Sequence, residues 1–352
     1  MQPVTVRILH PTAAPGSGEL AASLEAARGQ NAARLARRFG KAGAVDVRID
    51  MGSPDSRTFG QRLRELAAGV AAAAGLVVLG SGAIPLAHRR DLSDLLEAAA
   101  SGERRALANS FYSADVVAVG AAAILASVPD LPSDNALPRW LREHAGYRVD
   151  DLRRRWRLAI DLDSPLDAIL VRRGSDLDEG LARLVRDRLA RIGEVVRDPA
   201  AELLVAGRTS AATLRWLERR TASRTRALSE ERGLRAIGLA PADGPRAQRP
   251  PRSVLGLLLN DRGPEDLGPI LAELGDAAAV DTRVLLAHRL GADEAGWPSA
   301  EDRFASDLLL AERVEDPWLR ALTASARDST IPILLGAHTL VGPGLRLVAR
   351  RR

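Results

Sequence analysis

Cysteine is absent from the 352-residue chain, so disulfide bonds, thiolate metal ligands and cysteine nucleophiles are excluded. Any metal ion must therefore bind to carboxylate, imidazole or backbone oxygen groups, a set that suits hard cations such as Mg²⁺. Lysine is nearly absent too, because Lys41 is the only one and the net charge of +5 comes almost entirely from arginine. Nucleic-acid surfaces usually combine a basic stripe with stacking aromatics, whereas aromatic residues are only 3% of this chain and its arginines are dispersed. We expect no nucleic-acid partner.

Long apolar runs are missing as well. The longest, residues 66–80, consists largely of Ala and Gly and falls short of the ~20 residues that a membrane helix needs. The opening residues, MQPVTVRILHP, are typical of a strand and lack the basic-then-apolar order of a secretory signal. We therefore expect a cytoplasmic protein without a membrane partner. The sequence does not indicate an oligomeric state.

The first half of the chain alternates apolar runs with amphipathic stretches, which is typical of a layered, mostly parallel α/β sheet. We expect one α/β domain over residues 1–173. Its predicted strands lie at 4–9, 45–49, 75–82, within 104–120 and at 156–165, and its predicted helices lie at 20–39, 59–73, 92–99 and from 133 onward.

The second half repeats this alternation. Residues 175–196 have apolar positions at helical spacing, and we expect a bridging helix within 174–198. A second, mostly parallel α/β domain of unknown function is predicted for 199–352. Its expected strands lie at 201–207, 253–261, 280–288 and 331–338.

Three carboxylates crowd the stretch AIDLDSPLDA at residues 159–168. Like charges this close repel unless a cation, a hydrogen-bond network or open water relieves them. Proline breaks the extended chain at Ser164-Pro165, which would let Asp161 and Asp163 turn toward one Mg²⁺ ion. Structural capping is the alternative role for this pair. For Asp167 we expect a capping role at the start of the next helix.

Residues 76–167 resemble the central and distal part of MobA-like nucleotidyltransferases, the group that includes the molybdenum-cofactor and coenzyme F420 guanylyltransferases. The resemblance rests on VVLGSGAIPL at 77–86 and DLDSPLD at 161–167, which are similar to the family's acidic residue followed by Pro-Leu and to its D-x-D-[TS]-P-x-D motif. It implies a nucleotidyltransferase-like (GT-A-type) α/β/α sandwich, with Asp161 and Asp163 as catalytic residues and metal ligands. The C-terminal half resembles no family that we recognise.

The sequence departs from the family pattern at two places. Gly80-Ser81-Gly82 stands where the family has its first acidic residue, and PTAAPGSGEL replaces the family's N-terminal Gly-rich loop. We expect the backbone amides of these turns to face the cofactor's phosphates. The expected contacts are Gly16, Ser17, Gly18, Ser81 and Gly82. For the first turn, an ordinary strand-to-helix connection is the alternative.

Two polar clusters in this half suggest recognition of a base, a sugar or an acceptor. The first, in ALANSFYSADVVA, contains Asn109, Ser110, Tyr112, Ser113 and Asp115. The second, in SDNALPRWL, contains Asp134, Asn135 and Arg139. A polar loop is the alternative for the first cluster, and a helix start with capping residues is the alternative for the second.

Residues that follow predicted strands of the second half form another candidate site, because ligands of parallel sheets bind at the carboxyl ends of the strands. Arg208, Thr209 and Ser210 could cradle an anion, with helix capping as the alternative. His288 and His338 could act as acid–base groups, or could be structural residues.

These observations predict a nucleotidyltransferase-like protein that binds a nucleotide or phosphorylated metabolite with Mg²⁺. If catalytic, it would transfer a nucleotidyl group to a phosphorylated acceptor in cofactor metabolism. One alternative is a catalytically degenerate nucleotide-binding or scaffold module. Another is an enzyme that acts on a phosphorylated small molecule at an interdomain or C-terminal-domain site.

Overall fold

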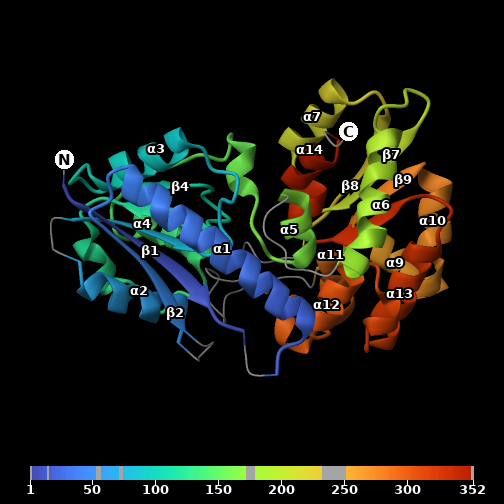
Figure 1. Ribbon diagram of the computed structural model, residues 1–352, viewed down its shortest axis with the longest axis horizontal. Helices are drawn as coiled ribbons and strands as arrows, with labels where there is room; N and C mark the ends of the chain where they lie inside the picture. Colours follow the sequence, from blue (N-terminus) through green and yellow to red (C-terminus); the bar gives the residue numbers. More distant parts are fainter. Residues whose placement is uncertain are drawn as a thin grey trace. The chain divides into compact units, whose positions relative to one another are not determined.

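The computed structural model describes residues 2–13, 16–52, 57–70, 74–171, 179–231 and 251–349. These residues form two compact units (Figure 1). Among them, the first unit contains the residues up to Gly16 and Glu25–Leu162. The second contains Ser17–Leu24 and the residues from Asp163 onward. The two units divide after Leu162, before the predicted domain end at 173. Residue 173 and the predicted start of the bridging helix at 174 lie outside the described residues.

The first unit is built on a six-stranded sheet in which one strand runs against the others. The strand order is β2-β1-β3-β5-β4-β6, and β5 is antiparallel to its neighbours β3 and β4. The strands are β1 (Val4–Pro11), β2 (Asp46–Gly52), β3 (Gly75–Gly80), β4 (Arg105–Ala108), β5 (Val116–Val119) and β6 (Arg148–Asp151). The predicted α/β class is therefore confirmed, with a mixed rather than purely parallel sheet.

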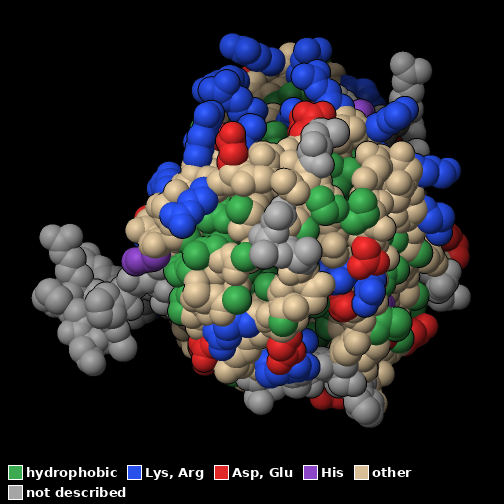
Figure 2. Space-filling view, turned by 90° about the vertical axis from the view of Figure 1, so that its left-hand side faces the viewer, with side chains coloured by type: hydrophobic (Ala, Val, Ile, Leu, Met, Phe, Trp, Pro, Cys, Tyr) green, Lys and Arg blue, Asp and Glu red, His purple; other side chains and the backbone are tan. Residues whose placement is uncertain are grey.

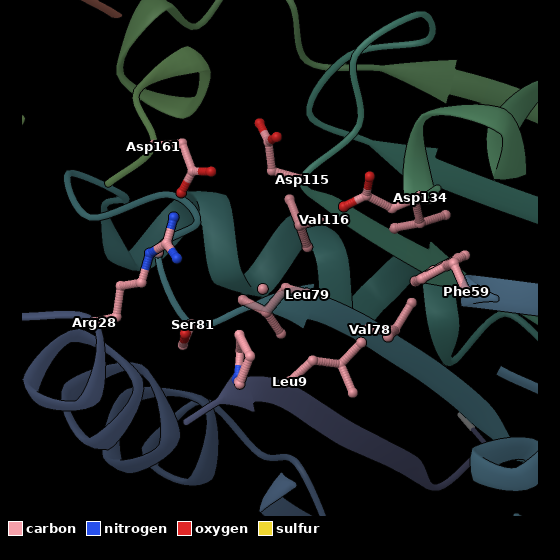
Figure 3. Close-up of a pocket in the computed structure, with 14 residues that line it drawn as sticks. Leu9, Arg28, Phe59, Val78, Leu79, Ser81, Asp115, Val116, Asp134 and Asp161 are labelled. Carbon is pink, nitrogen blue, oxygen red and sulfur yellow. The ribbon is translucent and has the colours of Figure 1, made fainter. Parts of the chain in front are cut away.

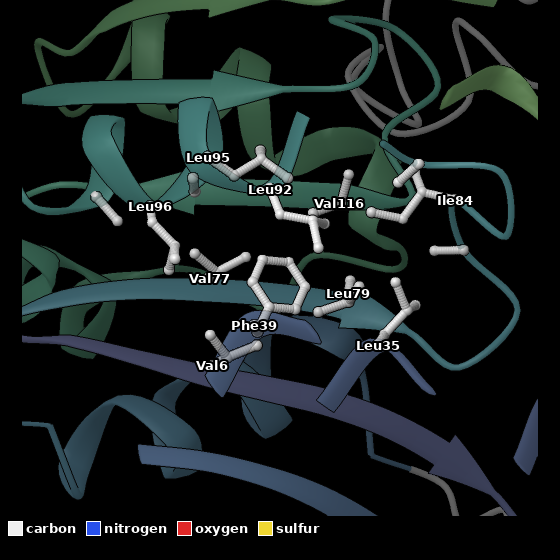
Figure 4. Close-up of a cluster of buried hydrophobic side chains, with 14 of the residues drawn as sticks. Val6, Leu35, Phe39, Val77, Leu79, Ile84, Leu92, Leu95, Leu96 and Val116 are labelled. Atoms are coloured by element: carbon white, nitrogen blue, oxygen red, sulfur yellow. The ribbon is translucent and has the colours of Figure 1, made fainter. Parts of the chain in front are cut away.

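Helices cover both faces of this sheet because alternate strand residues are apolar on both faces. On one face, Phe39 of α1 (Glu19–Lys41) and Leu92 of α3 (Arg89–Ala99) pack on Val6 and Val77 (Figure 4). The opposite face is covered by α2 (Phe59–Ala68), the short helix η1 (Ala122–Ser127) and α4 (Leu137–Glu143). The result is a three-layered unit.

The second unit has a four-stranded, fully parallel sheet with the order β10-β9-β7-β8. Its strands are β7 (Glu202–Gly207), β8 (Arg224–Ser229), β9 (Ala277–Asp281) and β10 (Ile333–Gly336). Its helices are α5 (Pro165–Val171), α6 (Glu179–Val195), α7 (Ala211–Arg220), α9 (Val254–Arg262), α10 (Leu267–Leu274), α11 (Thr282–Leu290), α12 (Ala300–Asp307), α13 (Pro317–Asp328) and α14 (Leu345–Val348). Helix α6, the predicted bridge, contacts β9 and β10 and belongs to this unit.

Several predicted strands are wrong. Residues 253–261 form α9, because the Ser253 side chain accepts a hydrogen bond from the Gly256 amide and starts a helix. The strand expected at 280–288 ends at Asp281, whose side chain caps α11. The chain at 156–165 forms a 3₁₀ turn and an irregular connection that ends at the start of α5, rather than a strand. Strand β8 was not predicted, because its half-exposed sequence RTRALS lacks an apolar run.

Charged side chains are unevenly distributed on the face shown in Figure 2. In Figure 2, Lys and Arg side chains gather along the upper edge of the face toward the viewer and mix with Asp and Glu below it. In the part of the chain that the structure describes, no helix is long and apolar enough to cross a bilayer.

Gly60 and Gly69 offer a matched test of the packing around α2. A Cβ atom at Gly60 would lie 1.9 Å from the Pro129 carbonyl oxygen, whereas one at Gly69 would meet only the Leu66 oxygen at 3.9 Å. We expect Gly60→Ala to lower the free energy of unfolding by about 3 kcal/mol because backbone must move. Gly69→Ala should leave it nearly unchanged. Denaturant unfolding measures both, and equal midpoints for the two variants would contradict the packing described.

Candidate functional site

The candidate site of the first unit lies where the strand order changes direction. After β1 the chain adds β2 on one side and β3 on the other, so β1 and β3 flank a topological switch point, the usual ligand position of open α/β sheets. A pocket of about 240 Å³ opens at the carboxyl ends of these two strands (Figure 3). It is lined by Leu9, Pro11, Arg28, Phe59, Val78, Leu79, Gly80, Ser81, Gly82, Asp115, Val116, Val117, Asp134 and Asp161.

The pocket combines an apolar floor with a charged rim. Side chains from β1, β3 and β5, together with Phe59 of α2, supply the apolar part. Figure 3 shows Asp161, Asp115 and Asp134 along one side of the pocket, with the guanidinium group of Arg28 directed toward Asp161. The rim therefore contains three carboxylates and one guanidinium group.

The loop after β3 is held in place by the polar side of α1. The Asn31 amide group donates to the carbonyl oxygens of Ser81 (2.8 Å) and Ala83 (3.0 Å), and Arg34 donates to that of Pro85 (2.6 Å). Within this loop the fully buried Ile84 has a φ of +45°, a strained conformation for a β-branched residue. The loop is thus fixed by long-range contacts, so Ser81 and Gly82 have a defined position at the pocket.

Asp161 reaches the same place from a distant segment. The Leu162 amide donates to the Gly82 carbonyl oxygen at 3.2 Å, and Arg28 Nε donates to the Leu162 carbonyl oxygen at 2.6 Å. A Cβ atom on Gly82 would lie 2.6 Å from Asp161 Oδ1 and 3.0 Å from the Leu162 oxygen. Because there is no room for a side chain at position 82, glycine allows the two segments to meet. Three predicted site residues, Ser81, Gly82 and Asp161, are brought together here.

Ser81 also contacts a residue that sequence reasoning missed. Its hydroxyl lies 3.0 Å from Nδ1 of His10, which stands near the end of β1 and is 5% exposed. Burial lowers the pKa of His10, and the charge of Glu25 opposes this only in part. The imidazole is therefore a neutral hydrogen-bonding group below the pocket.

The first polar cluster has mainly a structural role. The buried Asn109 joins the two ends of the loop between β4 and β5, because its Oδ1 accepts from the Asp115 amide (2.9 Å) and its Nδ2 donates to Asp115 Oδ2 (2.7 Å). Asp115 is thereby fixed at the pocket rim. Ser110, Tyr112 and Ser113 do not line this pocket, and their role in substrate binding stays a prediction.

The second polar cluster is divided. Asp134 lines the pocket, as predicted, whereas Asn135 is exposed and its amide donates to Asp134 Oδ1 at 2.9 Å. Arg139 pairs with Glu143 at 3.3 Å, one turn along α4. Asn135 and Arg139 therefore have the roles of a helix start and a surface ion pair.

A carboxylate of the chain itself lies directly after the predicted phosphate loop at Gly16–Gly18. Glu301 accepts hydrogen bonds from the amides of Leu20 (3.0 Å) and Ala21 (3.1 Å), at the beginning of α1. A Cβ atom on Gly18 would lie 2.3 Å from the carboxyl carbon of Glu301. The start of α1 therefore binds a negative group. The contact of Gly16, Ser17 and Gly18 with a phosphate stays a prediction.

The acidic stretch at 161–167 is divided between the two units. Asp163 lies in the second unit, with Oδ2 at 3.9 Å from Nδ1 of His338, while Asp161 lines the pocket of the first. Binding of one Mg²⁺ by both residues remains a prediction. Among the described ranges, no group of three or more His, Asp or Glu side chains is arranged to hold a metal ion.

The capping role predicted for Asp167 is confirmed. Its Oδ2 atom accepts hydrogen bonds from the amides of Asp163 (3.0 Å) and Ser164 (2.8 Å) and from the Ser164 hydroxyl (3.0 Å). Asp167 is fully buried. Burial and the nearby charge of Asp163 raise its pKa to about 8, so the folded chain keeps this carboxyl protonated at neutral pH.

The histidines and the arginine predicted in the second half have different environments. His288 lies within α11, not at a strand end, and its ring nitrogens contact the Ser253 amide (3.1 Å) and the Asn260 side chain (3.0 Å). It therefore links α11 to α9 rather than serving as an exposed acid–base group. His338 does follow strand β10, as predicted. Arg208 forms an ion pair with Asp281, and Ser210 caps α7 by accepting from the Thr213 amide.

Comparison with known proteins gives no independent guide to this site. No family model, no curated protein and no solved structure matches the chain.

Asp167 provides a test of the second unit through the pH dependence of stability. The unfolded chain releases this proton near pH 3.8, whereas the folded chain keeps it to about pH 8. The contribution of protonated Asp167 to the free energy of unfolding is therefore complete below pH 3.8 and is lost as the pH rises through 8. Asn at this position does not titrate. We expect the free energy of unfolding of Asp167→Asn to rise relative to the wild type between pH 4 and 8, as measured by urea unfolding. A difference that does not change with pH would contradict the buried, protonated state.

Proposed function

We propose that the pocket of the first unit binds a nucleotide or phosphorylated metabolite together with Mg²⁺. The observation that carries this proposal is the contact between the Ser81–Gly82 turn and the segment of Asp161. This contact leaves no space for a side chain at Gly82. These are the two segments on which the resemblance to MobA-like nucleotidyltransferases rests. Their position at a topological switch point supports the same conclusion.

The charge of the rim is the reason for including a metal ion. Asp115, Asp134 and Asp161 line the same pocket, and a phosphate bound there would lie close to their carboxylates. Mg²⁺ is typically bound by one or two protein carboxylates, with phosphates and water as its other ligands. Asp161 and Asp115 fit this donor set and would hold the ion. When bound, Mg²⁺ would neutralise the phosphate charge.

The other groups of the pocket suit the remainder of such a ligand. The apolar floor formed by Leu9, Phe59 and Val78 offers a surface on which a planar base or other apolar group can pack. Asp134 lies at the rim near Phe59 in Figure 3 and can accept hydrogen bonds from amino or hydroxyl groups. The chain therefore contributes orientation and partial exclusion of water.

Nucleotide binding is tested by thermal stability with and without Mg²⁺. We expect GTP or CTP with Mg²⁺ to raise the melting temperature by several degrees, and neither Mg²⁺ nor nucleotide alone to do so. Asp161→Asn should remove most of this increase because a metal-binding carboxylate is lost. Asp150→Asn is the control. Asp150 lies on β6, pairs with Arg105 and Arg148, and does not line the pocket. Stabilisation that is independent of Mg²⁺ and identical in Asp161→Asn would refute the proposal.

Catalysis is a separate question from binding. Transfer of a nucleotidyl group to a phosphorylated acceptor would release pyrophosphate, which can be measured directly. Gly80-Ser81-Gly82 contains no carboxylate, which favours a binding module over an active transferase. Mg²⁺-dependent binding without pyrophosphate release would identify the binding module, and release that Asp161→Asn abolishes would identify the transferase.

A further inference from the structure

The second unit has a switch point of its own. From β7 the chain adds β8 on one side and β9 on the other, so the carboxyl ends of β7 and β9 flank this point. The first residues beyond them are Arg208 and Thr209 after β7, and Asp281 ends β9. None of these residues belongs to the pocket of the first unit.

Arg208 is held rigidly at this edge by Asp281. Its Nε donates to Asp281 Oδ2 at 2.6 Å and its Nη2 donates to Oδ1 at 3.0 Å. Asp281 is fully buried and also accepts from the Arg283 amide at 3.2 Å. Burial opposes its ionisation. The charge and hydrogen bonds of Arg208, together with the charges of His338 and Arg283, outweigh burial and keep the pKa of Asp281 below its ordinary value. The arginine thus pays little further conformational entropy when it binds a ligand.

Gly207 makes this arrangement possible. Its φ of +125° lies in a region that L-residues rarely adopt, and a Cβ atom would be 2.2 Å from the Cβ of Asp281. The close approach of the two strand ends places the Arg208 backbone amide 3.4 Å from Asp281 Oδ2. Backbone geometry and the ion pair together determine where the guanidinium group lies.

Two hydrogen-bond donors at this edge have no acceptor among the described residues. Arg208 is 17% exposed, and its Nη1 atom donates to no group in the described residues. The buried Thr209 hydroxyl likewise has no partner in the part of the chain that the structure describes. Buried polar groups without partners are rare and call for an explanation. His338 adds an imidazole nearby, close enough to influence Asp281.

We propose that Arg208 and Thr209 form an anion subsite for the phosphate group of a small molecule, separate from the pocket of the first unit. Phosphate oxygens accept hydrogen bonds from guanidinium and hydroxyl groups. The pairing of Arg208 with Asp281 makes the site nearly neutral, which favours a ligand bound through directed hydrogen bonds over a general attraction for anions.

Titration with inorganic phosphate tests this subsite. Binding is followed through the NMR signals of the Arg208 Nε–H and Thr209 amide groups. We expect phosphate to shift both signals in a saturable way, and acetate at equal ionic strength to shift them much less. Thr209→Val should weaken phosphate binding about tenfold, because a hydrogen bond to a charged ligand is lost. Its melting temperature should not fall, since the hydroxyl has no hydrogen-bond partner in the described ranges.

Replacement of Arg208 alone would leave Asp281 buried without its partner, so the double variant Arg208→Gln/Asp281→Asn removes both charges together. It should fold and lose saturable phosphate binding. Asp161→Asn, which alters only the first pocket, should retain the response at Arg208 even if nucleotide binding fails. Unchanged phosphate affinity in Thr209→Val, or loss of the Arg208 response in Asp161→Asn, would overturn the proposal.

Discussion

The short backbone contact between Leu162 and Gly82, closed by the side chain of Arg28, is the constraint on which the candidate site depends. It joins two loops that lie 80 residues apart in the sequence and brings Asp161 to the carboxyl edge of β3. The contact needs a position without a side chain, because a Cβ atom at Gly82 would collide with both Asp161 and the Leu162 carbonyl oxygen. The rest of the pocket is arranged around this junction.

Both units place their polar residues according to the same rule of topology. In each sheet, the second strand in the chain adds to one side of the first, and the next strand adds to the other side. The loops that leave the first and third of these strands must then separate, which creates a position for a ligand. In the first unit, this position is an open pocket whose rim contains three carboxylates and one guanidinium group. In the second, it holds a nearly neutral ion pair, so the two positions suit different ligands.

Much of the first fold unit could be predicted from the sequence because its strands are short apolar runs separated by amphipathic helices. The second unit was harder, since leucine-rich stretches such as 254–259 satisfy the pattern of a buried strand as well as that of a helix. Only the capping side chains of Ser253 and Asp281 distinguish the two, and they were not given this role. Strand β8 could not be recognised because it lies at a sheet edge and exposes most of its residues.

Ser81 and Gly82 were predictable because their motif follows a strand, and Asp161 because it belongs to an acidic motif. The two polar clusters contributed Asp115 and Asp134. Arg28 and His10 were missed because their periodic positions in a helix and a strand resemble those of ordinary surface or core residues. Their roles arise from contacts across 134 and 71 positions of the chain, which no local pattern records. The contact between Glu301 and the amides at the start of α1 was missed for the same reason, because only the fold brings the two segments together.

The most direct measurement of the central claim is calorimetric titration of Mg²⁺-nucleotide into Gly82→Ala, the smallest change that separates the two segments. If the junction at Gly82 forms the site, the variant should remain folded and bind at least about tenfold more weakly than the wild type, a loss of ~1.4 kcal/mol in binding free energy. Wild-type affinity in this variant would contradict the account, because the ligand would then bind without the junction.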